Sequence, residues 1–368
     1  HRHVLYHYGM PNQTYSQIPC ERLEDCWDMT RCSKRPVTVY GYGETAVSMA
    51  KLAAKRYPDN LQWVEDPQTA CVLLATRHSF ATPEQMHTQP LWNAGRNHLL
   101  WDADAYFGEN TDRPFSTVTN FDYASLATAA MMDANIRLDF DISTATMRME
   151  PSAEFQQPAQ LENLLTAAGS RPTLVTFKGN IFHWDQIWWQ HRYLAYEYWE
   201  RAPDVLVDVV CKLSKRIKTP RRKRQYETSR DDFAAQLLNS TFAFCPGGGS
   251  VGSFRFAEAL SLGAIPVVTS EFVAPLAPEV DWSGCLVRVS EARILDVPRI
   301  LRQIPEDSVM ARQARCRFLF DKIIGWSELH GRLDPITRIL PLALRIWSRR
   351  IENYHRMREQ GEAMLNDA

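Results

Sequence analysis

Short apolar runs alternate with segments of helical spacing along most of this chain. The runs have the length and the branched or aromatic content of buried strands, and turn residues bound them. The predicted strands cover residues 37–40, part of 66–75, 98–101, 173–179, 205–211, 242–245 and 265–268. The predicted helices cover residues 45–55, 121–134, 185–200, 230–239, 253–262, 297–304, 308–324 and 335–365. This alternation favours an α/β fold with mainly parallel sheets.

The chain length predicts two domains, and one polar stretch separates them. A chain of 368 residues is typical of two domains. Residues 150–172 are polar and contain three prolines, so we expect the interdomain linker there. We predict a cysteine-containing tail at residues 1–33 and two Rossmann-like domains, 34–165 on the acceptor side and 166–330 on the nucleotide-sugar side, that face each other across a cleft. Residues 331–368 are predicted to form a terminal helix that packs back on the first domain.

The overall charge and hydropathy exclude two classes of interaction. The formal net charge is −1, so there is no global electrostatic attraction to nucleic acid. No run of eighteen apolar residues and no signal peptide occurs, so no membrane span is predicted within this sequence. Apolar residues make up 45% of the chain, which is enough to form a sizeable core in each domain.

The stretch 242–268 carries the clearest ligand-binding pattern. Its apolar run ends at Pro246, helical spacing begins at Ser253, and Gly263 separates the helix from a second apolar run. Four glycines lie between the first run and the helix, namely Gly247, Gly248, Gly249 and Gly252. Such a loop lets backbone N–H groups and a helix N-terminus approach an anion, which is typical of a diphosphate site. A tight turn in an α/β core is the structural alternative, because the glycine loop alone is a weak signal and the Gly-Lys-Ser/Thr of a Walker A loop does not follow it.

Several segments carry a family resemblance. They are Ser253-Phe-Arg-Phe-Ala-Glu-Ala-Leu-Ser-Leu-Gly263 with its continuation to Val267, and residues 279–283, 91–101 and 139–143. These segments resemble the exostosin family of glycosyltransferases, glycosyltransferase family 47. The resemblance covers about residues 20–330 and implies a GT-B fold whose second domain binds a nucleotide sugar. It implies an inverting transfer from a UDP-sugar, with UDP-glucuronic acid and a β linkage the best match, to a glycan acceptor.

The resemblance also implies a cellular location and a domain organisation. Relatives of this type are type II membrane proteins, so we expect a protein of the Golgi lumen whose membrane anchor is absent from this sequence. Because the sequence ends near residue 368, we also expect the second, C-terminal transferase domain of animal exostosins to be absent. Two Asn-x-Ser/Thr sequons, at Asn12 and Asn239, favour a glycoprotein of the secretory pathway.

The predicted donor site combines the glycine loop with basic side chains. Arg255 lies one turn into the helix that follows the loop, where a guanidinium can bind a diphosphate, and Glu258 is a candidate for the ribose or sugar hydroxyls. The alternative for both is an ion pair across one helical turn. Lys178 and Arg192 are further candidates for the phosphates. The loop residues predicted to contact the donor are Gly248, Gly249, Ser250, Gly252 and Ser253.

The first domain should supply a base for the acceptor hydroxyl and contacts to the acceptor sugar. The candidate bases are Asp141, His98 and Asp102, with Asp104 and Asp139 as neighbours of the same type. The structural alternative for Asp141 is an ion pair with Arg137. Arg96 and Asn97 are candidates to orient the acceptor, or to stabilise their own loop. Two Asp-x-Asp pairs occur, Asp102 with Asp104 and Asp139 with Asp141. The resemblance places both pairs outside the donor domain, so no metal site is predicted, although a divalent metal is compatible with a site of this kind.

The cysteines predict disulfides and no zinc site. Cys20, Cys26 and Cys32 lack a Cys-x-x-Cys pair and a matching histidine pair. We therefore expect disulfides in an oxidising compartment. The segment 26–32 also resembles the cysteine pair that opens the exostosin domain. Its short spacing and the lumenal setting predict that at least Cys26 and Cys32 are disulfide-bonded.

One departure from the family pattern supports a second hypothesis. Animal exostosins carry several arginines where this chain has Gly247, Gly249 and Ser250. A catalytically silent glycan-binding or chaperone-like partner subunit on the same fold is therefore the alternative function. The basic run within residues 212–224 is interpreted as a solvated loop, with contact to an anionic polymer as its alternative. The expected partners are a UDP-sugar and a glycan, no nucleic acid is expected, and both homo- and heterodimers are compatible with the sequence.

Overall fold

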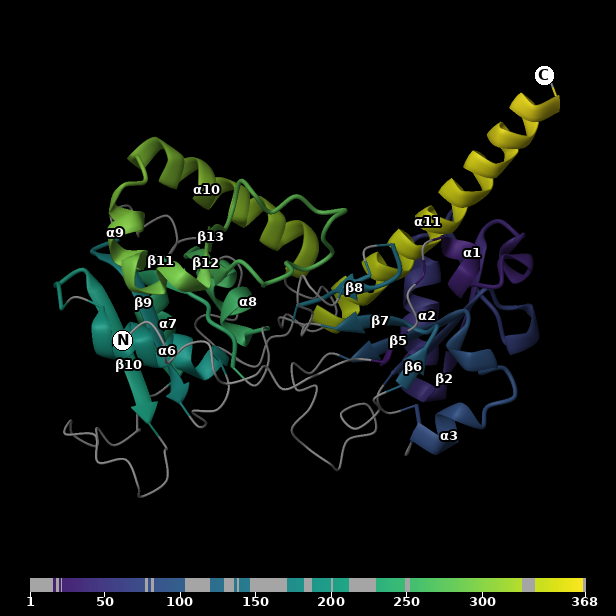
Figure 1. The fold of residues 1–368 in the computed structure, drawn as a ribbon, viewed down its shortest axis with the longest axis horizontal. Helices are drawn as coiled ribbons and strands as arrows, with labels where there is room; N and C mark the ends of the chain where they lie inside the picture. Colours follow the sequence, from purple (N-terminus) through teal and green to yellow (C-terminus); the bar gives the residue numbers. More distant parts are fainter. Residues whose placement is uncertain are drawn as a thin grey trace.

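The computed structural model describes residues 16–17, 20, 22–76, 79–80, 83–102, 120–128, 136–137, 139–145, 171–181, 187–199, 201–211, 230–248, 252–325 and 335–366. These residues form two lobes, and the long helix α11 (Pro335–Asn366) runs from the junction between the lobes along the lobe that contains α1 and β8 (Figure 1). Each lobe contains one parallel sheet of five or six strands with helices packed against it. The predicted α/β architecture, two Rossmann-like domains in a GT-B arrangement, is confirmed.

The first domain contains a six-stranded parallel sheet with the order β3-β2-β4-β5-β7-β8. The strands are β2 (Val37–Tyr42), β3 (Leu61–Trp63), β4 (Val72–Thr76), β5 (His98–Asp102), β7 (Ser125–Thr128) and β8 (Ile142–Ser143). A separate pair joins β1 (Ser16–Gln17) to β6 (Asn120–Asp122). The short helices are α1 (Leu23–Cys26), α3 (Pro83–His87) and the 3-10 turns at Met29–Cys32, Pro67–Thr69 and Asn93–Gly95.

Helix α2 (Gly43–Arg56) shows how small residues set the packing on this sheet. Ala46, Ala50 and Ala53 recur every three or four positions and are buried. Gly41 of β2 faces the start of the helix, and an ideal Cβ there would lie 2.4 Å from the backbone carbon of Ala46. The helix therefore packs on the sheet with its backbone in direct contact with β2.

The second domain contains a five-stranded parallel sheet with the order β10-β9-β11-β12-β13. The strands are β9 (Thr173–Ile181), β10 (Val205–Cys211), β11 (Ser240–Phe244), β12 (Ile265–Thr269) and β13 (Val287–Val289). The helices are α6 (Ile187–Tyr198), α7 (Arg230–Leu238), α8 (Phe254–Ser261), the 3-10 helix Glu291–Asp296, α9 (Val297–Arg302), α10 (Glu306–Leu319) and the π-helical segment Phe320–Ile324. Most of the strands and helices predicted for this domain are therefore confirmed.

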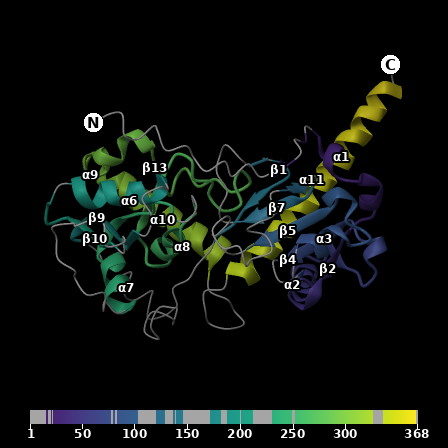
Figure 2. The ribbon, with the colours of Figure 1, turned by 60° about the horizontal axis from the view of Figure 1, so that its bottom comes forward.

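Helix α11 follows the second domain in sequence but packs on the first (Figures 1 and 2). Arg56 of α2 donates a hydrogen bond to the carbonyl oxygen of Thr337, at 3.0 Å. Trp347 is fully buried, and its ring stacks on that of Trp27 with the centroids 4.3 Å apart. The core of the first domain is therefore completed by a helix from the other end of the chain.

The two domains also meet directly beside β8. The Ser143 hydroxyl donates to the carbonyl oxygen of Val273 at 2.8 Å, and the Ser143 carbonyl accepts from the N–H of Leu276 at 2.6 Å. Arg350 of α11 adds an ion pair with Glu279 of the second domain, at 2.5 Å. These contacts fix one side of the junction between the domains.

One predicted element is wrong and one lies outside the described residues. The sequence predicts a helix at 121–134, but residues 125–128 form β7. This strand pairs with β5 on one side and β8 on the other, and its four residues are all buried. Asp122 has a φ of +47°, which interrupts any helix there. Of the linker predicted at 150–172, all but the last two residues fall outside the described part of the chain.

Three disulfides occur among the described residues, joining Cys20 to Cys26, Cys32 to Cys71, and Cys285 to Cys316, and Cys245 is free. Cys26 and Cys32 are thus both disulfide-bonded, as predicted. A bond between the two, which their short spacing suggested, is wrong. Cys26 ends α1 and bonds back to Cys20, whereas Cys32 ends the next short helix beside Cys71 at the start of β4.

Candidate functional site

The candidate site lies at the carboxyl end of β11 and at the start of α8. Parallel α/β sheets bind ligands at this edge. Strand β11 runs into the buried glycines Gly247 and Gly248, and α8 begins after Ser253, whose hydroxyl accepts a hydrogen bond from the N–H of Arg255 at 3.3 Å. Gly263, with a φ of +72°, follows the helix and leads into β12. The two predicted strands and the helix between them are present, while residues 249–251 of the loop lie outside the described part of the chain.

Arg192 is a basic side chain that lies against the described part of the glycine loop. It projects from α6, and its Nε donates a hydrogen bond to the carbonyl oxygen of Gly247 at 2.7 Å. Its guanidinium carbon lies 5.6 Å from the centre of the Phe177 ring. An ideal Cβ on Gly248 would lie only 2.7 Å from Nη2 of Arg192. The guanidinium therefore occupies the space that a side chain at 248 would take.

Arg255 is held in the helix by several partners. Its Nη1 lies 3.0 Å from Oε2 of Glu258, and its Nη2 donates to the carbonyl oxygen of Lys178. Its guanidinium also lies over the Phe233 ring, 3.9 Å from the centroid. The side chains of Arg255 and Glu258 are 18% and 8% exposed. The geometry thus favours the ion-pair alternative for these two residues.

Lys178 extends the charged cluster onto β9. Its Nζ lies 3.5 Å from Oδ2 of Asp208, which is its neighbour in the register with β10. Cys245, the residue after β11, is buried next to Arg255 and Glu258, and burial raises the pKa of its thiol. Three cations and two carboxylates therefore meet around the carboxyl ends of two neighbouring strands.

The remaining predicted donor residues are only partly described. Gly252 is buried and Ser253 is half-buried at the start of α8. Gly249 and Ser250 lie outside the described residues, so their predicted donor contacts stay predictions. His191 precedes Arg192 on α6, and burial lowers the pKa of His191 to about 4. Its imidazole is therefore neutral at physiological pH.

His98, one of the predicted bases, is a buried structural group. Its Nδ1 lies 2.9 Å from the carbonyl oxygen of Arg96, so this nitrogen carries the proton, and its Nε2 faces the Tyr42 hydroxyl at 3.4 Å. The ring lies between the aromatic rings of Tyr42 and Trp92. Burial lowers the pKa of His98 to about 4. With both nitrogens engaged inside the domain, His98 cannot approach an acceptor hydroxyl.

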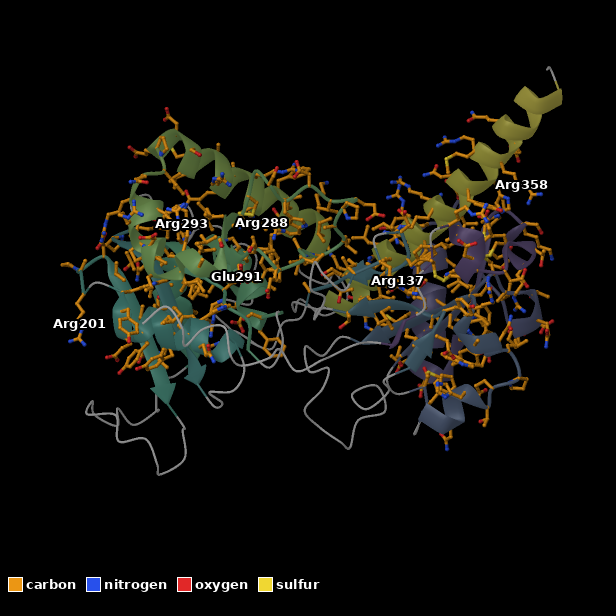
Figure 3. The ribbon with its side chains drawn as sticks, in the orientation of Figure 1. Arg137, Arg201, Arg288, Glu291, Arg293 and Arg358 are labelled. Atoms are coloured by element: carbon orange, nitrogen blue, oxygen red, sulfur yellow. A yellow bond between two sulfur atoms is a disulfide. The ribbon has the colours of Figure 1, made fainter. Side chains whose placement is uncertain are left out.

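Asp141 is also engaged within the first domain. Its Oδ1 accepts from the N–H of Leu126 at 2.9 Å, and both of its oxygens accept from the Arg137 guanidinium at 3.0–3.1 Å. Its side chain is 1% exposed. Asp141 thus joins β7 to the turn before β8, as the structural alternative predicted, and its geometry does not support a role as the base. Figure 3 shows Arg137 in this part of the first domain.

The other predicted residues of the first domain fall at opposite edges of its sheet. Asp102 ends β5 at the carboxyl edge, and the structure gives no description of its side chain. Arg96 and Asn97 precede β5 at the amino edge. The buried Asn97 amide accepts from the N–H of Asp28 at 2.8 Å and donates to the carbonyl oxygen of Cys71 at 3.0 Å. Asn97 therefore stabilises its own loop rather than an acceptor.

Two features of the site were missed from the sequence. Asp208 partners Lys178, and the signal for it was a single acid inside the apolar run of β10. The contact between Arg192 and Gly247 joins residues 55 positions apart and had no local signal. Within the described residues, no group of three metal-ligating side chains gathers. No helix in the same part of the chain has the length and apolar content to cross a membrane.

The family assignment follows from a match to the exostosin GT47 domain over residues 54–304. The chain belongs to the exostosin family. It is 27% identical over 332 residues to Exostosin-1b of Danio rerio and to Exostosin-1 of Mus musculus, and 26% identical over 346 residues to Exostosin-1 of Drosophila melanogaster. The first two alignments cover 82% of this chain and 42% of the relative, and the third covers 83% and 43%. The chain thus spans less than half the length of these exostosins.

Two solved structures align with this exostosin-family chain at low sequence identity. WaaG, a glycosyltransferase involved in lipopolysaccharide biosynthesis, aligns with a TM-score of 0.39 and 10% identity over 84% of this chain and 99% of its own. A trehalose-6-phosphate protein of E. coli bound with UDP-2-fluoro glucose aligns with a TM-score of 0.40 and 8% identity over 82% of this chain and 77% of its own.

Proposed function

We propose that this chain is an inverting glycosyltransferase that takes a sugar from a UDP-sugar and transfers it to a glycan acceptor. The observation that carries the proposal is the position of Arg192 against Gly247 and Gly248 at the carboxyl end of β11. Membership of the exostosin family supports the same activity. The resemblance to animal exostosins favours UDP-glucuronic acid as the donor and a β linkage as the product.

The proposed chemistry needs charge stabilisation on the donor side. As the sugar leaves, the nucleoside diphosphate gains negative charge, and donors fixed in advance stabilise that charge more than they stabilise the intact donor. Arg192 and Lys178 would supply cationic groups, and the start of α8 would supply backbone N–H groups. Arg255 and Glu258 would position β9 and α8 around this site through their ion pair and the bond to the Lys178 carbonyl.

The acceptor side needs a base in the first domain. Of the predicted candidates, Asp102 is the one that ends a strand at the carboxyl edge, where α/β sheets bind ligands. We therefore propose Asp102 as the base. Asp102→Asn should abolish transfer and leave the affinity for UDP within about twofold of the parent, because the residue belongs to the other domain.

Calorimetric titration with UDP tests the donor site directly. Arg192→Ala should weaken UDP binding by roughly tenfold or more, as expected for the loss of a charged hydrogen bond. Gly248→Ala should weaken it as well, because the new methyl group would displace the guanidinium. Arg201→Ala is the matched control, since Arg201 is exposed at the outer edge of the second domain (Figure 3). Equal affinity in all four proteins would refute the donor site.

A catalytically silent glycan-binding subunit is the second candidate. The observation that favours it is the engagement of Arg255 with Glu258, Lys178 and Phe233, in a loop region that lacks the arginines of animal exostosins. A hydrolysis screen with a panel of UDP-sugars separates the two functions. Slow release of UDP from one donor supports the transferase, whereas no release and no UDP binding support the silent subunit.

A further inference from the structure

A large concavity lies in the first domain, away from the candidate donor site. Its volume is about 1340 Å³, which exceeds the roughly 300–1,000 Å³ of sites for drug-sized ligands. We call it the amino-edge groove, because it lies where the chain enters β5 and β8. Three parts of the chain line it, namely the segment Arg22–Ser33, the turns with Asn93, Arg96, Asp139 and Phe140, and α11 from Arg350 to Arg358. Figures 1 and 2 both place α11 beside α1.

The walls of the groove are held rigidly. One disulfide joins Cys20 to Cys26, and another ties Cys32 to Cys71, the residue before β4. The Asn97 amide accepts from the N–H of Asp28, and His355 of α11 contacts the carbonyl oxygen of Cys32 at 2.9 Å. A site held in this way is formed before a ligand arrives, which lowers the entropic cost of binding.

Among the described residues, the guanidinium of Arg96 in the groove has no carboxylate partner. Four arginines and one histidine face three carboxylates. Arg22 pairs with Glu24 at 3.3 Å, Arg350 pairs with Glu279, and Asp28 accepts from the Thr30 hydroxyl at 2.6 Å. Arg96 instead lies over the Tyr123 ring, 4.1 Å from its centroid. A half-buried guanidinium on an aromatic ring is well suited to bind a carboxylate in a bidentate manner.

The turn that carries Arg96 is conformationally strained. Asn93, Ala94 and Asn97 have φ values of +40°, +52° and +63°. Such conformations are rare for residues other than glycine and tend to occur at functional sites, where the surrounding contacts maintain them. Ala94 has no polar side chain that could stabilise its conformation locally. Arg96 lies within this turn and lines the groove.

We propose that the amino-edge groove binds an acidic oligosaccharide, with Arg96 as the ligand of a sugar carboxylate. The groove also offers the polar groups that sugar hydroxyls need, in the exposed Asp139 carboxylate and the exposed Asn353 amide. The half-buried Tyr354 adds an aromatic ring to the same wall. The size of the groove fits several sugar units rather than one.

This site is separate from the proposed transfer site, although its ligand class rests on the proposed function. Arg96 precedes β5 and Asp102 ends it, and a strand of this length spans roughly 13 Å. The groove therefore lies at the opposite edge of the sheet from the proposed base. It would hold a part of the glycan chain that is distant from the residue being extended, so that the acceptor has two contacts with the enzyme.

Calorimetric titration of the whole chain with a hyaluronan hexasaccharide, which alternates glucuronic acid with a neutral N-acetyl sugar, tests the groove. We expect binding that weakens with salt, and weaker binding of the neutral chitohexaose. Arg96→Ala should raise the Kd for the acidic hexasaccharide by about tenfold or more. Asn353→Asp, which adds a negative charge on an exposed position, should also raise the Kd. Arg349→Ala is the control, because Arg349 is exposed on the same helix and does not line the groove.

The outcomes are distinct from those of the donor site. No binding to the parent chain, or equal loss in Arg96→Ala and Arg349→Ala, overturns the proposal. Equal affinity for an oligoglutamate of the same charge overturns the saccharide assignment and points to an acidic peptide. UDP is titrated in parallel. If the chain binds the hexasaccharide through Arg96 but does not bind UDP, the groove proposal stands and the transferase proposal is refuted.

Discussion

Replacing Arg255 by alanine should destabilise the second domain before it affects any chemistry. The change removes the ion pair with Glu258, the hydrogen bond to the Lys178 carbonyl and the contact with the Phe233 ring. Breaking a buried ion pair typically costs about 3–5 kcal/mol. We expect the lower end, about 3 kcal/mol, because Arg255 is 18% exposed and water can reach the carboxylate left behind. For a domain of this size the loss corresponds to a fall in Tm of roughly 6–12 °C.

Urea denaturation followed by circular dichroism gives the free energy of unfolding, and calorimetry gives Tm. Arg255→Met combined with Glu258→Leu should recover most of the lost stability, since replacing both members of a buried pair leaves no unpaired charge. Glu258→Gln should cost less than Arg255→Ala, because the amide can still accept from the guanidinium. If Arg255→Ala unfolds within about 0.5 kcal/mol of the parent, the structural role is refuted. If Arg255→Ala lowers the affinity for UDP without lowering stability, Arg255 instead contacts the donor phosphates.

Further changes test the fold and its pH response. Burial lowers the folded-state pKa of His98 to about 4, below its ordinary 6.5, so the unfolded chain takes up the proton first as the pH falls. The free energy of unfolding should therefore fall by about 3 kcal/mol between pH 6.5 and pH 4. Urea midpoints should then depend less on pH in His98→Gln, and an unchanged slope would contradict the assignment. Replacing both Cys32 and Cys71 by alanine should cost roughly 2–5 kcal/mol, and non-reducing peptide mapping should recover that bond in the parent. Gly41→Ala should lower the free energy of unfolding by about 3 kcal/mol or more, because its Cβ would overlap the α2 backbone. Gly284→Ala is the control, since its Cβ would only touch Arg315 at an ordinary distance, and its Tm in a thermal melt should be nearly that of the parent.

The strands that could be predicted from the sequence are those with long apolar runs. Strands β9, β11 and β12 lie inside a parallel sheet, and β10, at the edge of the sheet and only partly buried, has an apolar run that Asp208 alone interrupts. Strands of two to four residues, such as β3, β8 and β13, are too short to show a period. Their position is fixed by pairing with neighbours. In β7 the burial of all four side chains overrides the helical preference of the local sequence.

The site was predictable in its local part and not in its long-range part. The glycine loop and the helix that follows it are adjacent in sequence, so their pattern identified the carboxyl end of β11. The partner of Arg255 was predictable because Glu258 lies one helical turn away. The contact of Arg192 with Gly247, and the location of Arg96 at the opposite edge of the sheet from Asp102, depend on how whole elements pack and leave no trace in the local sequence.

The long reach of α11 has a consequence for the order in which the chain can fold during synthesis. The ring of Trp27 is covered by Trp347, and the turn at Cys32 is bound by His355. A nascent first domain therefore cannot bury this face until more than 300 later residues have been made. At about 5–20 residues per second, the wait after β8 is translated is roughly 10–40 s, during which an aromatic surface stays open to solvent or to a chaperone. The N-terminal domain, although synthesised first, is thus the last to be completed.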